Sequence, residues 1–135
     1  MTDLESRRAA LDTHLAAIRA TGIRNLIAGQ DSDGQGHFDT RSPTDNSLIC
    51  QVAKGEAADI DAAAQAARDA FPAWAAMDGA RRKALLHEVA DAIVARADEI
   101  ALCECWDTGQ AHRFMSKAAL RGAENFRFFA DLAPG

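Results

Sequence analysis

The sequence predicts a mostly helical chain with a β-hairpin and one further short strand near its N-terminus. Two observations predict this fold class. Between residues 23 and 54, short apolar runs alternate with turn sequences such as DSDGQG and TDNS. From residue 55 onward the chain becomes rich in Ala, Arg, Glu and Leu, which are strong helix formers.

Residues 1–24 are predicted to form an N-terminal amphipathic helix. Thr2 and Glu5 have the spacing of a capping box, in which each residue satisfies a backbone N–H of the first turn. Thr21-Gly22 is expected to end the helix. The apolar residues between these signals recur on one helical face, and they are Leu4, Leu11, Leu15 and Ile18.

The following segment predicts the β-structure. IRNLIAGQ and HFDTRSP flank the turn sequence DSDGQG, so we expect them to pair as a hairpin. SLICQVAKG predicts a further strand, because Leu48, Cys50 and Val52 alternate with Ile49 and Gln51.

Three helices are expected in the second half. The first covers EAADIDAAAQAARDAFPAW, the second runs without interruption from about Asp78 to Trp106, and the third covers RFMSKAALRGAENFRFFADL up to Pro134-Gly135. Gly109 is predicted to adopt a left-handed conformation that stops the second helix.

Cys103 and Cys105 raise three alternatives: a metal site, a redox pair, or packing. Helical spacing places Cys103 on the buried stripe and Cys105 on a different side, whereas two ligands on one helix need a separation of three or four residues. The acidic neighbours Glu104 and Asp107 would raise the pKa of a thiol. Packing is the favoured interpretation.

Charge and composition restrict the class of protein. The 135 residues carry a formal charge of −5, without the basic cluster that nucleic-acid binding requires. No stretch is long and apolar enough to span a bilayer, and the start MTDLESRRAA does not resemble a secretory signal. Three cysteines are too few for a disulfide framework. We therefore expect a cytoplasmic protein with reduced thiols, bound to neither nucleic acid nor membrane.

Several segments, taken in order, resemble the N-terminal region of NAD(P)-dependent aldehyde dehydrogenases. The resemblance runs from about Asn25 to Leu132, with SPTDNS standing where the family has an N-P-x-T-G-E turn. The ending NFRFFAD is most similar to the branch that oxidises 2-hydroxymuconic or aminomuconic semialdehyde. The segments that carry the resemblance are NLIAGQ, FDTRSP, SLICQVAKGEAADIDAAAQAARDAFPAW, ARRKALLHEVADAIVARADEIALCECWDTG and NFRFFADL.

The resemblance implies an α/β family fold, in which residues 25–135 are the incomplete N-terminal part of an aldehyde dehydrogenase domain. It implies an intact enzyme that oxidises an aldehyde, favoured as a carboxylated semialdehyde, to the acid with NAD or NADP. The family's catalytic and nucleotide-binding residues correspond to positions beyond Gly135, so no residue here is expected to be catalytic or to bind the cofactor. The implied partners are the remainder of the enzyme chain and further copies in a homo-oligomer. The alternative is a non-enzymatic helical interaction module derived from the family.

Two candidate sites follow from the resemblance. Many family members hold a monovalent cation at positions that match Thr40, the backbone carbonyl of Arg41, and Asp107; alternatively, Asp107 only caps its turn. In the muconic semialdehyde branch an arginine matching Arg121 grips the substrate carboxylate. Its guanidinium could instead pair with Glu124, three residues on.

A second arginine of the same helix helps to weigh these alternatives. Arg121 and Arg127 are six residues apart and are expected to project on different sides of the helix. One of them is therefore expected to serve packing and the other function.

Overall fold

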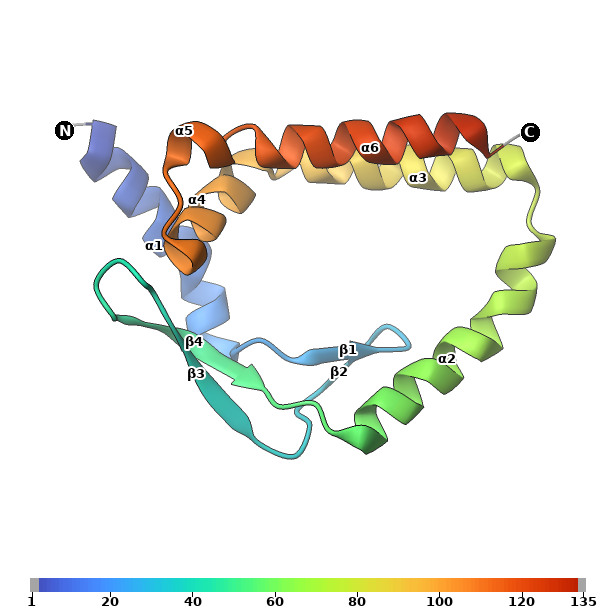
Figure 1. The fold of residues 1–135 in the computed structure, drawn as a ribbon, viewed down its shortest axis with the longest axis horizontal. Helices are drawn as coiled ribbons and strands as arrows, with labels where there is room; N and C mark the ends of the chain where they lie inside the picture. The colour runs from blue at the N-terminus through green and yellow to red at the C-terminus, as the bar shows by residue number, and fades with distance from the viewer. Residues whose placement is uncertain (1–2, 134–135) are drawn as a thin grey trace. The chain divides into compact units, whose positions relative to one another are not determined.

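The computed structural model describes residues 3–133, which form helices α1–α6 and strands β1–β4 (Figure 1). The chain divides into two compact parts. The helical part comprises the residues up to Leu11 together with the segment from Met77 onward, and the hairpin part comprises Asp12–Ala76. The expectation of a mostly helical chain is confirmed, and its strands are short and antiparallel.

Helix α1 (Asp3–Thr21) is present where the N-terminal helix was expected. Leu11 and Leu15 are buried, whereas Leu4 is exposed. Thr2 of the proposed capping box lies outside the described residues. Gly22 follows the helix with φ +69°, and a Cβ at this position would lie only 2.9 Å from the carbonyl oxygen of Gln51. Glycine therefore allows the chain to pass close to the backbone of Gln51.

The hairpin part contains two hairpins instead of one hairpin and a further strand. β1 (Asn25–Ile27) pairs antiparallel with β2 (Gln30–Ser32). The two residues between them, Ala28 and Gly29, have φ values of +52° and +77°. Positive φ at both central positions is what a type I′ hairpin turn requires, so the hairpin turn lies here. The predicted turn in DSDGQG is present at residues 34–35, but the strands on its two sides do not pair with each other.

The second hairpin joins β3 (His37–Arg41) to β4 (Leu48–Ala53), with an irregular register between Thr40 and Arg41. The expected pairing of residues 23–30 with HFDTRSP is therefore wrong. Alternation of side chains alone does not reveal which strand pairs with which. The two-residue turn at Ala28-Gly29 makes β2 the partner of β1. The buried side chains of β4 are Ile49, Cys50 and Ala53.

Helix α2 (Ala57–Ala76) begins with a side-chain cap, because the N–H of Glu56 donates to Asp59 Oδ2 at 2.9 Å. Pro72 lies inside the helix. None of its twenty residues, all within the described range, is buried.

The helical part replaces the expected long helix with two helices. α3 (Gly79–Ala95) begins at Asp78, whose side chain accepts a hydrogen bond from the N–H of Ala80, and α4 (Ala97–Thr108) ends at Gly109 with φ +72°, as predicted. The break lies at Arg96, where φ is −112° and ψ is 18°. An uninterrupted helix from Asp78 to Trp106 is therefore wrong, and the sequence contains neither Gly nor Pro at the break to signal it.

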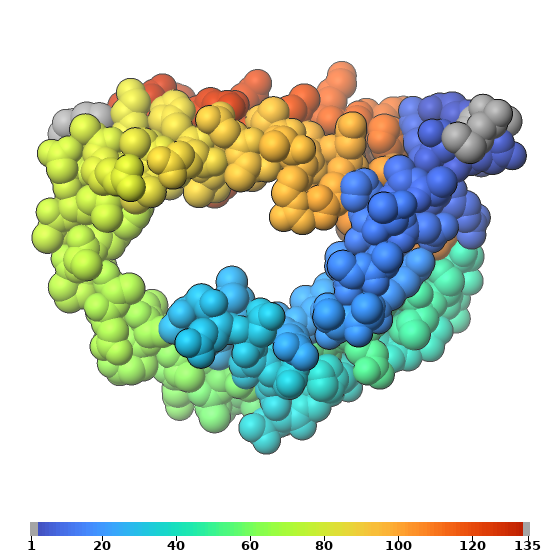
Figure 2. Space-filling view, turned by 180° about the vertical axis from the view of Figure 1, so that it is seen from behind, coloured from blue at the N-terminus to red at the C-terminus, as the bar shows by residue number. Residues whose placement is uncertain are grey.

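The last expected helix is also divided, into α5 (His112–Met115) and α6 (Ala118–Leu132). α6 lies antiparallel along α3 (Figure 1), and Figure 2 shows this pair from the opposite side. The seam between the two helices consists of small buried residues, namely Ala90 on α3 and Ala119, Ala123 and Ala130 on α6. Small side chains at a seam let two helix backbones approach closely. Among the described residues, no helix has the length and apolar character needed to cross a membrane.

Candidate substrate-binding face of α6

Interhelical ion pairs hold α6 against α3 in a defined rotation. Arg127 Nη2 lies 2.7 Å from Asp91 Oδ1. Asp131 Oδ1, one turn later, lies 2.9 Å from Lys83 Nζ and 3.0 Å from His87 Nε2. The alanine seam and these contacts come from one side of α6, so the opposite side is left facing outward.

Lys83 and His87 on α3 also change the acidity of Asp131. Two hydrogen bonds hold the pKa of the Asp131 carboxyl below its ordinary value, the one with Lys83 having the larger effect and the one with His87 the smaller. Asp131 is therefore charged at neutral pH, and the contact with Lys83 is an ion pair.

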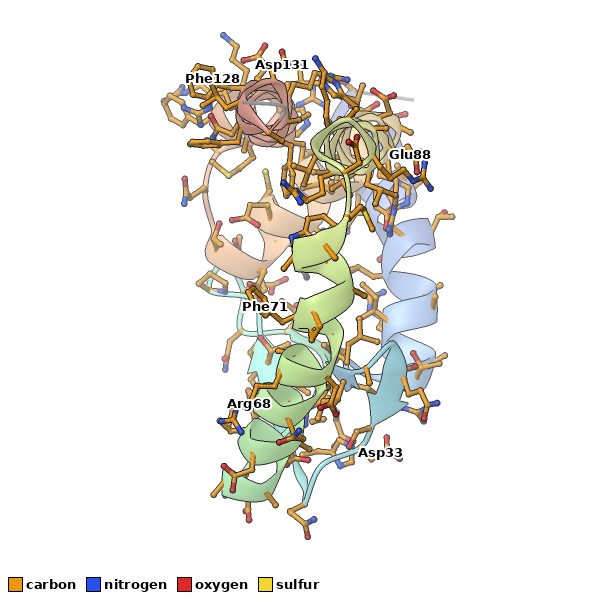
Figure 3. The ribbon with its side chains drawn as sticks, turned by 90° about the vertical axis from the view of Figure 1, so that its right-hand side faces the viewer. Asp33, Arg68, Phe71, Glu88, Phe128 and Asp131 are labelled. Carbon is orange, nitrogen blue, oxygen red and sulfur yellow. The ribbon has the colours of Figure 1, made fainter. Side chains whose placement is uncertain are left out.

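The outward side of α6 combines one cation with polar and apolar groups. Its members are spaced four, three and four residues apart, which places them in one stripe, and they are Arg121, Asn125, Phe128 and Leu132. All are exposed, Phe128 to 62%. Figure 3 shows Phe128 on the side of α6 turned away from α3. We call this stripe the outer face of α6.

Arg121 and Arg127 have different surroundings. Arg127 is bound to Asp91, whereas Arg121 is exposed and makes no ion pair or side-chain hydrogen bond within residues 3–133. The alternative pairing of Arg121 with Glu124 is not formed in the described chain. The guanidinium of Arg121 is thus available to a ligand, and a planar guanidinium can hold a carboxylate through two parallel hydrogen bonds.

The partner of Arg127 was not foreseen from the sequence. Asp91 is 36 positions away and lies on another helix. Only the packing of α6 on α3 brings the two side chains together, and no local spacing could have indicated this.

The two cysteines of α4 are placed as packing residues. Cys103 and Cys105 are both partly buried, and their charged neighbours differ: Glu99 and Arg96 for Cys103, Glu104 and Arg7 for Cys105. Burial, followed by the charge of Glu99, raises the pKa of Cys103. Burial, followed by the charge of Glu104, raises the pKa of Cys105. Both thiols are therefore protonated at neutral pH and are weak nucleophiles.

The candidate cation residues are divided between the compact parts. Thr40 and Arg41 lie at the irregular register of β3 in the hairpin part, where the guanidinium of Arg41 contacts Asp39 Oδ2 at 2.9 Å. Asp107 lies in the last turn of α4 in the helical part. Their convergence on one ion stays a prediction.

The turn after Asp107 has its own hydrogen bonds. Thr108 Oγ1 donates to the carbonyl of Glu104 at 2.7 Å, and the N–H of Gly109 donates to the carbonyl of Cys105 at 2.9 Å. Between residues 3 and 133, no three His, Cys, Asp or Glu side chains are grouped as a metal site.

The fold agrees with the class of protein that the ordered motifs suggested, the aldehyde dehydrogenases. A model described as "Aldehyde dehydrogenase family" matches residues 30–135. The chain belongs to the aldehyde dehydrogenase family.

Two curated proteins that are similar to this chain are named as dehydrogenases of muconic semialdehydes. The 2-hydroxymuconic semialdehyde dehydrogenase of Pseudomonas sp. (strain CF600) is 42% identical over 97 residues, which cover 70% of this chain and 20% of that protein. The 2-aminomuconic semialdehyde dehydrogenase of Danio rerio is 35% identical over 110 residues, which cover 81% of this chain and 23% of that protein.

Solved structures show the same family resemblance. HpcC from Thermus thermophilus superposes with a TM-score of 0.89 at 30% identity, covering 93% of this chain and 25% of HpcC. PnpE in complex with nicotinamide adenine dinucleotide superposes with a TM-score of 0.80 at 39% identity, covering 83% of this chain and 24% of PnpE. The chain thus spans about a fifth to a quarter of the length of these relatives.

Proposed function

We propose that this chain is the N-terminal part of an NAD- or NADP-dependent aldehyde dehydrogenase that oxidises a carboxylated semialdehyde to the acid, and that Arg121 holds the substrate carboxylate. The observation that carries the proposal is the contrast on α6 between Arg127, bound to Asp91, and Arg121, exposed and unpaired within residues 3–133. The names of the muconic semialdehyde dehydrogenases among the relatives support a substrate with an aldehyde at one end and a carboxylate at the other.

The role of this chain is binding rather than bond making. NAD(P) supplies the hydride acceptor, and water supplies the oxygen of the new acid. A guanidinium stays charged at any working pH, so Arg121 would fix one end of the substrate throughout the reaction. The protonated thiols of Cys103 and Cys105 are not proposed as nucleophiles.

The test is kinetic, in a full-length aldehyde dehydrogenase that carries this segment. Arg121→Ala should raise KM for a carboxylated semialdehyde by roughly 10- to 150-fold, the equivalent of about 1.5–3 kcal/mol for hydrogen bonds to a charged group. An uncharged aldehyde of similar length should be affected less than about twofold. Equal losses on both aldehydes would refute the carboxylate role.

Arg127→Ala is the contrasting variant on the same helix. It removes the contact with Asp91 rather than a contact with substrate, so any loss of activity should be similar for the two aldehydes. If only Arg121→Ala affects the two aldehydes unequally, Arg121 binds the substrate, whereas Arg127 only positions the helix.

We further propose that Asp107 contributes an oxygen ligand to a monovalent cation site, since oxygen atoms are the ligands such ions prefer. Replacing tetramethylammonium by potassium should raise the melting temperature of the full-length enzyme. Asp107→Asn should reduce that increase. If potassium raises the melting temperature of the variant as much as that of the wild type, Asp107 is not a ligand of the cation.

We also propose that other parts of the enzyme cover the exposed apolar side chains of this chain. Phe71 of α2 and Phe129 of α6 are 65% and 63% exposed, which favours association. The remainder of an aldehyde dehydrogenase chain and further copies in a cytoplasmic homo-oligomer are the proposed partners. Light scattering of the isolated 135-residue chain should show dimers or larger species, and a monomer at all concentrations would contradict the proposal.

A further inference from the structure

We infer that Asn125 is a specificity-determining residue, which recognises a hydroxyl or amino group on the carbon next to the substrate carboxylate. The inference rests on the proposed function of Arg121. It concerns a different atom of the substrate and therefore has its own test.

Asn125 lies next to Arg121 on α6. Asn125 follows Arg121 by four residues, so the two side chains are neighbours on the outer face of α6, with about 5–6 Å between their Cβ atoms. The alanine seam and Arg127 occupy the other side of the helix, which prevents α6 from turning this face toward α3. A small ligand held by Arg121 is thus within reach of Asn125.

The side chain of Asn125 is available to a ligand. Asn125 is exposed, and its amide makes no hydrogen bond with another described residue of the chain. The neighbouring alternative, Glu124, is also exposed, but its carboxylate would repel a carboxylate held by Arg121. Asn125 is therefore the polar neighbour compatible with an anionic ligand.

The amide of Asn125 can both accept and donate hydrogen bonds. Its oxygen accepts a hydrogen bond and its NH2 group donates two, so one asparagine can bind either a hydroxyl or an amino group. When Arg121 holds both carboxylate oxygens, the substituent on the adjacent carbon is the next polar group along the substrate. Phe128 and Leu132 continue the outer face as apolar surface, which suits the carbon chain between that substituent and the aldehyde.

The experiment uses Asn125→Leu, a replacement of similar shape without hydrogen-bonding groups, in a full-length aldehyde dehydrogenase that carries this segment. Three substrates are compared: 2-hydroxymuconic semialdehyde, muconic semialdehyde without the hydroxyl, and an uncharged aldehyde. The variant should lower kcat/KM for the hydroxylated substrate about five- to tenfold, as expected for one lost neutral hydrogen bond. The other two substrates should change less than about twofold.

Asn125→Asp is the second variant, and it keeps the acceptor oxygen while adding a negative charge. It should weaken both carboxylated substrates and spare the uncharged aldehyde, because the charge lies beside the carboxylate site. Circular dichroism melting should be unchanged in both variants, since residue 125 is exposed.

The outcomes distinguish this inference from the proposal on which it rests. If Arg121→Ala discriminates against both carboxylated substrates but Asn125→Leu does not separate the hydroxylated from the unsubstituted one, Asn125 has no recognition role and the proposed function stands. If Arg121→Ala affects all three substrates equally, the proposed function fails and the role of Asn125 fails with it.

Discussion

Helices α2 and α6 are both rich in alanine, yet they differ completely in burial. α2 has twenty residues and buries none, whereas the fifteen-residue α6 buries three alanines against α3. Alanine makes either segment helical. Packing depends on a second surface, which α3 provides for α6. Helix formation and helix burial are therefore separate properties of this chain.

The large apolar side chains are exposed on both helices. On α2, Ile60, Phe71 and Trp74 lie on one face and remain exposed. On α6 the small residues are inside and Phe128 and Phe129 are outside. The size of a side chain thus does not predict its burial on these helices. Where α6 packs closely against α3, only small side chains such as alanine fit between the two backbones. Phe128 and Phe129 are therefore free to contact groups other than α3.

The largest expected effect comes from enlarging one alanine of the α6 seam. Ala123 is fully buried, so Ala123→Leu should overpack the contact with α3 and lower the free energy of unfolding by about 1–3 kcal/mol. Ala64→Leu, at an exposed position of α2, should change it by less than about 0.5 kcal/mol. Urea denaturation of both variants measures the difference. Equal destabilisation would mean that α2 is packed as tightly as α6.

A smaller effect is expected from the ion pair that sets the rotation of α6. Arg127→Met should lower the free energy of unfolding by about 0.2–1 kcal/mol, because Asp91 is largely exposed and the pair is screened by solvent. Added salt should reduce the difference between the variant and the wild type.

Arg121→Met is the matched control, since Arg121 has no ion pair in the described range. It should leave the stability unchanged at low and at high salt. A salt-dependent loss in Arg121→Met as large as in Arg127→Met would contradict the division between the two arginines.

The smallest expected effect is the pH dependence that Asp131 contributes. Its pKa is lower in the folded chain than its ordinary value, so the unfolded state takes up the proton more readily. The stabilisation is present above the unfolded pKa and is lost as pH falls through the folded pKa. The difference in unfolding free energy between wild type and Asp131→Asn should therefore shrink as the solution becomes strongly acidic. A difference that grows toward low pH would show that the contacts with Lys83 and His87 act in another way.

The sequence by itself determined the features that depend on neighbouring residues. Helical composition, the stop at Gly109, the helix at the N-terminus and the ordered family motifs all follow from local propensity and spacing. The resemblance singles out Arg121, which stands directly before GAENFR, and its spacing from Arg127 indicates that the two arginines face different sides of the helix.

Only the tertiary structure decided the features that depend on distant residues. The strand pairing differs from the predicted one because Ala28 and Gly29 form the turn between β1 and β2. The predicted long helix is broken at Arg96, where the sequence has no Gly or Pro to indicate a break. The Arg127–Asp91 pair needed α6 to lie along α3. The physical reason is that local propensity acts within a few residues, whereas packing selects among the surfaces that the folded chain brings together.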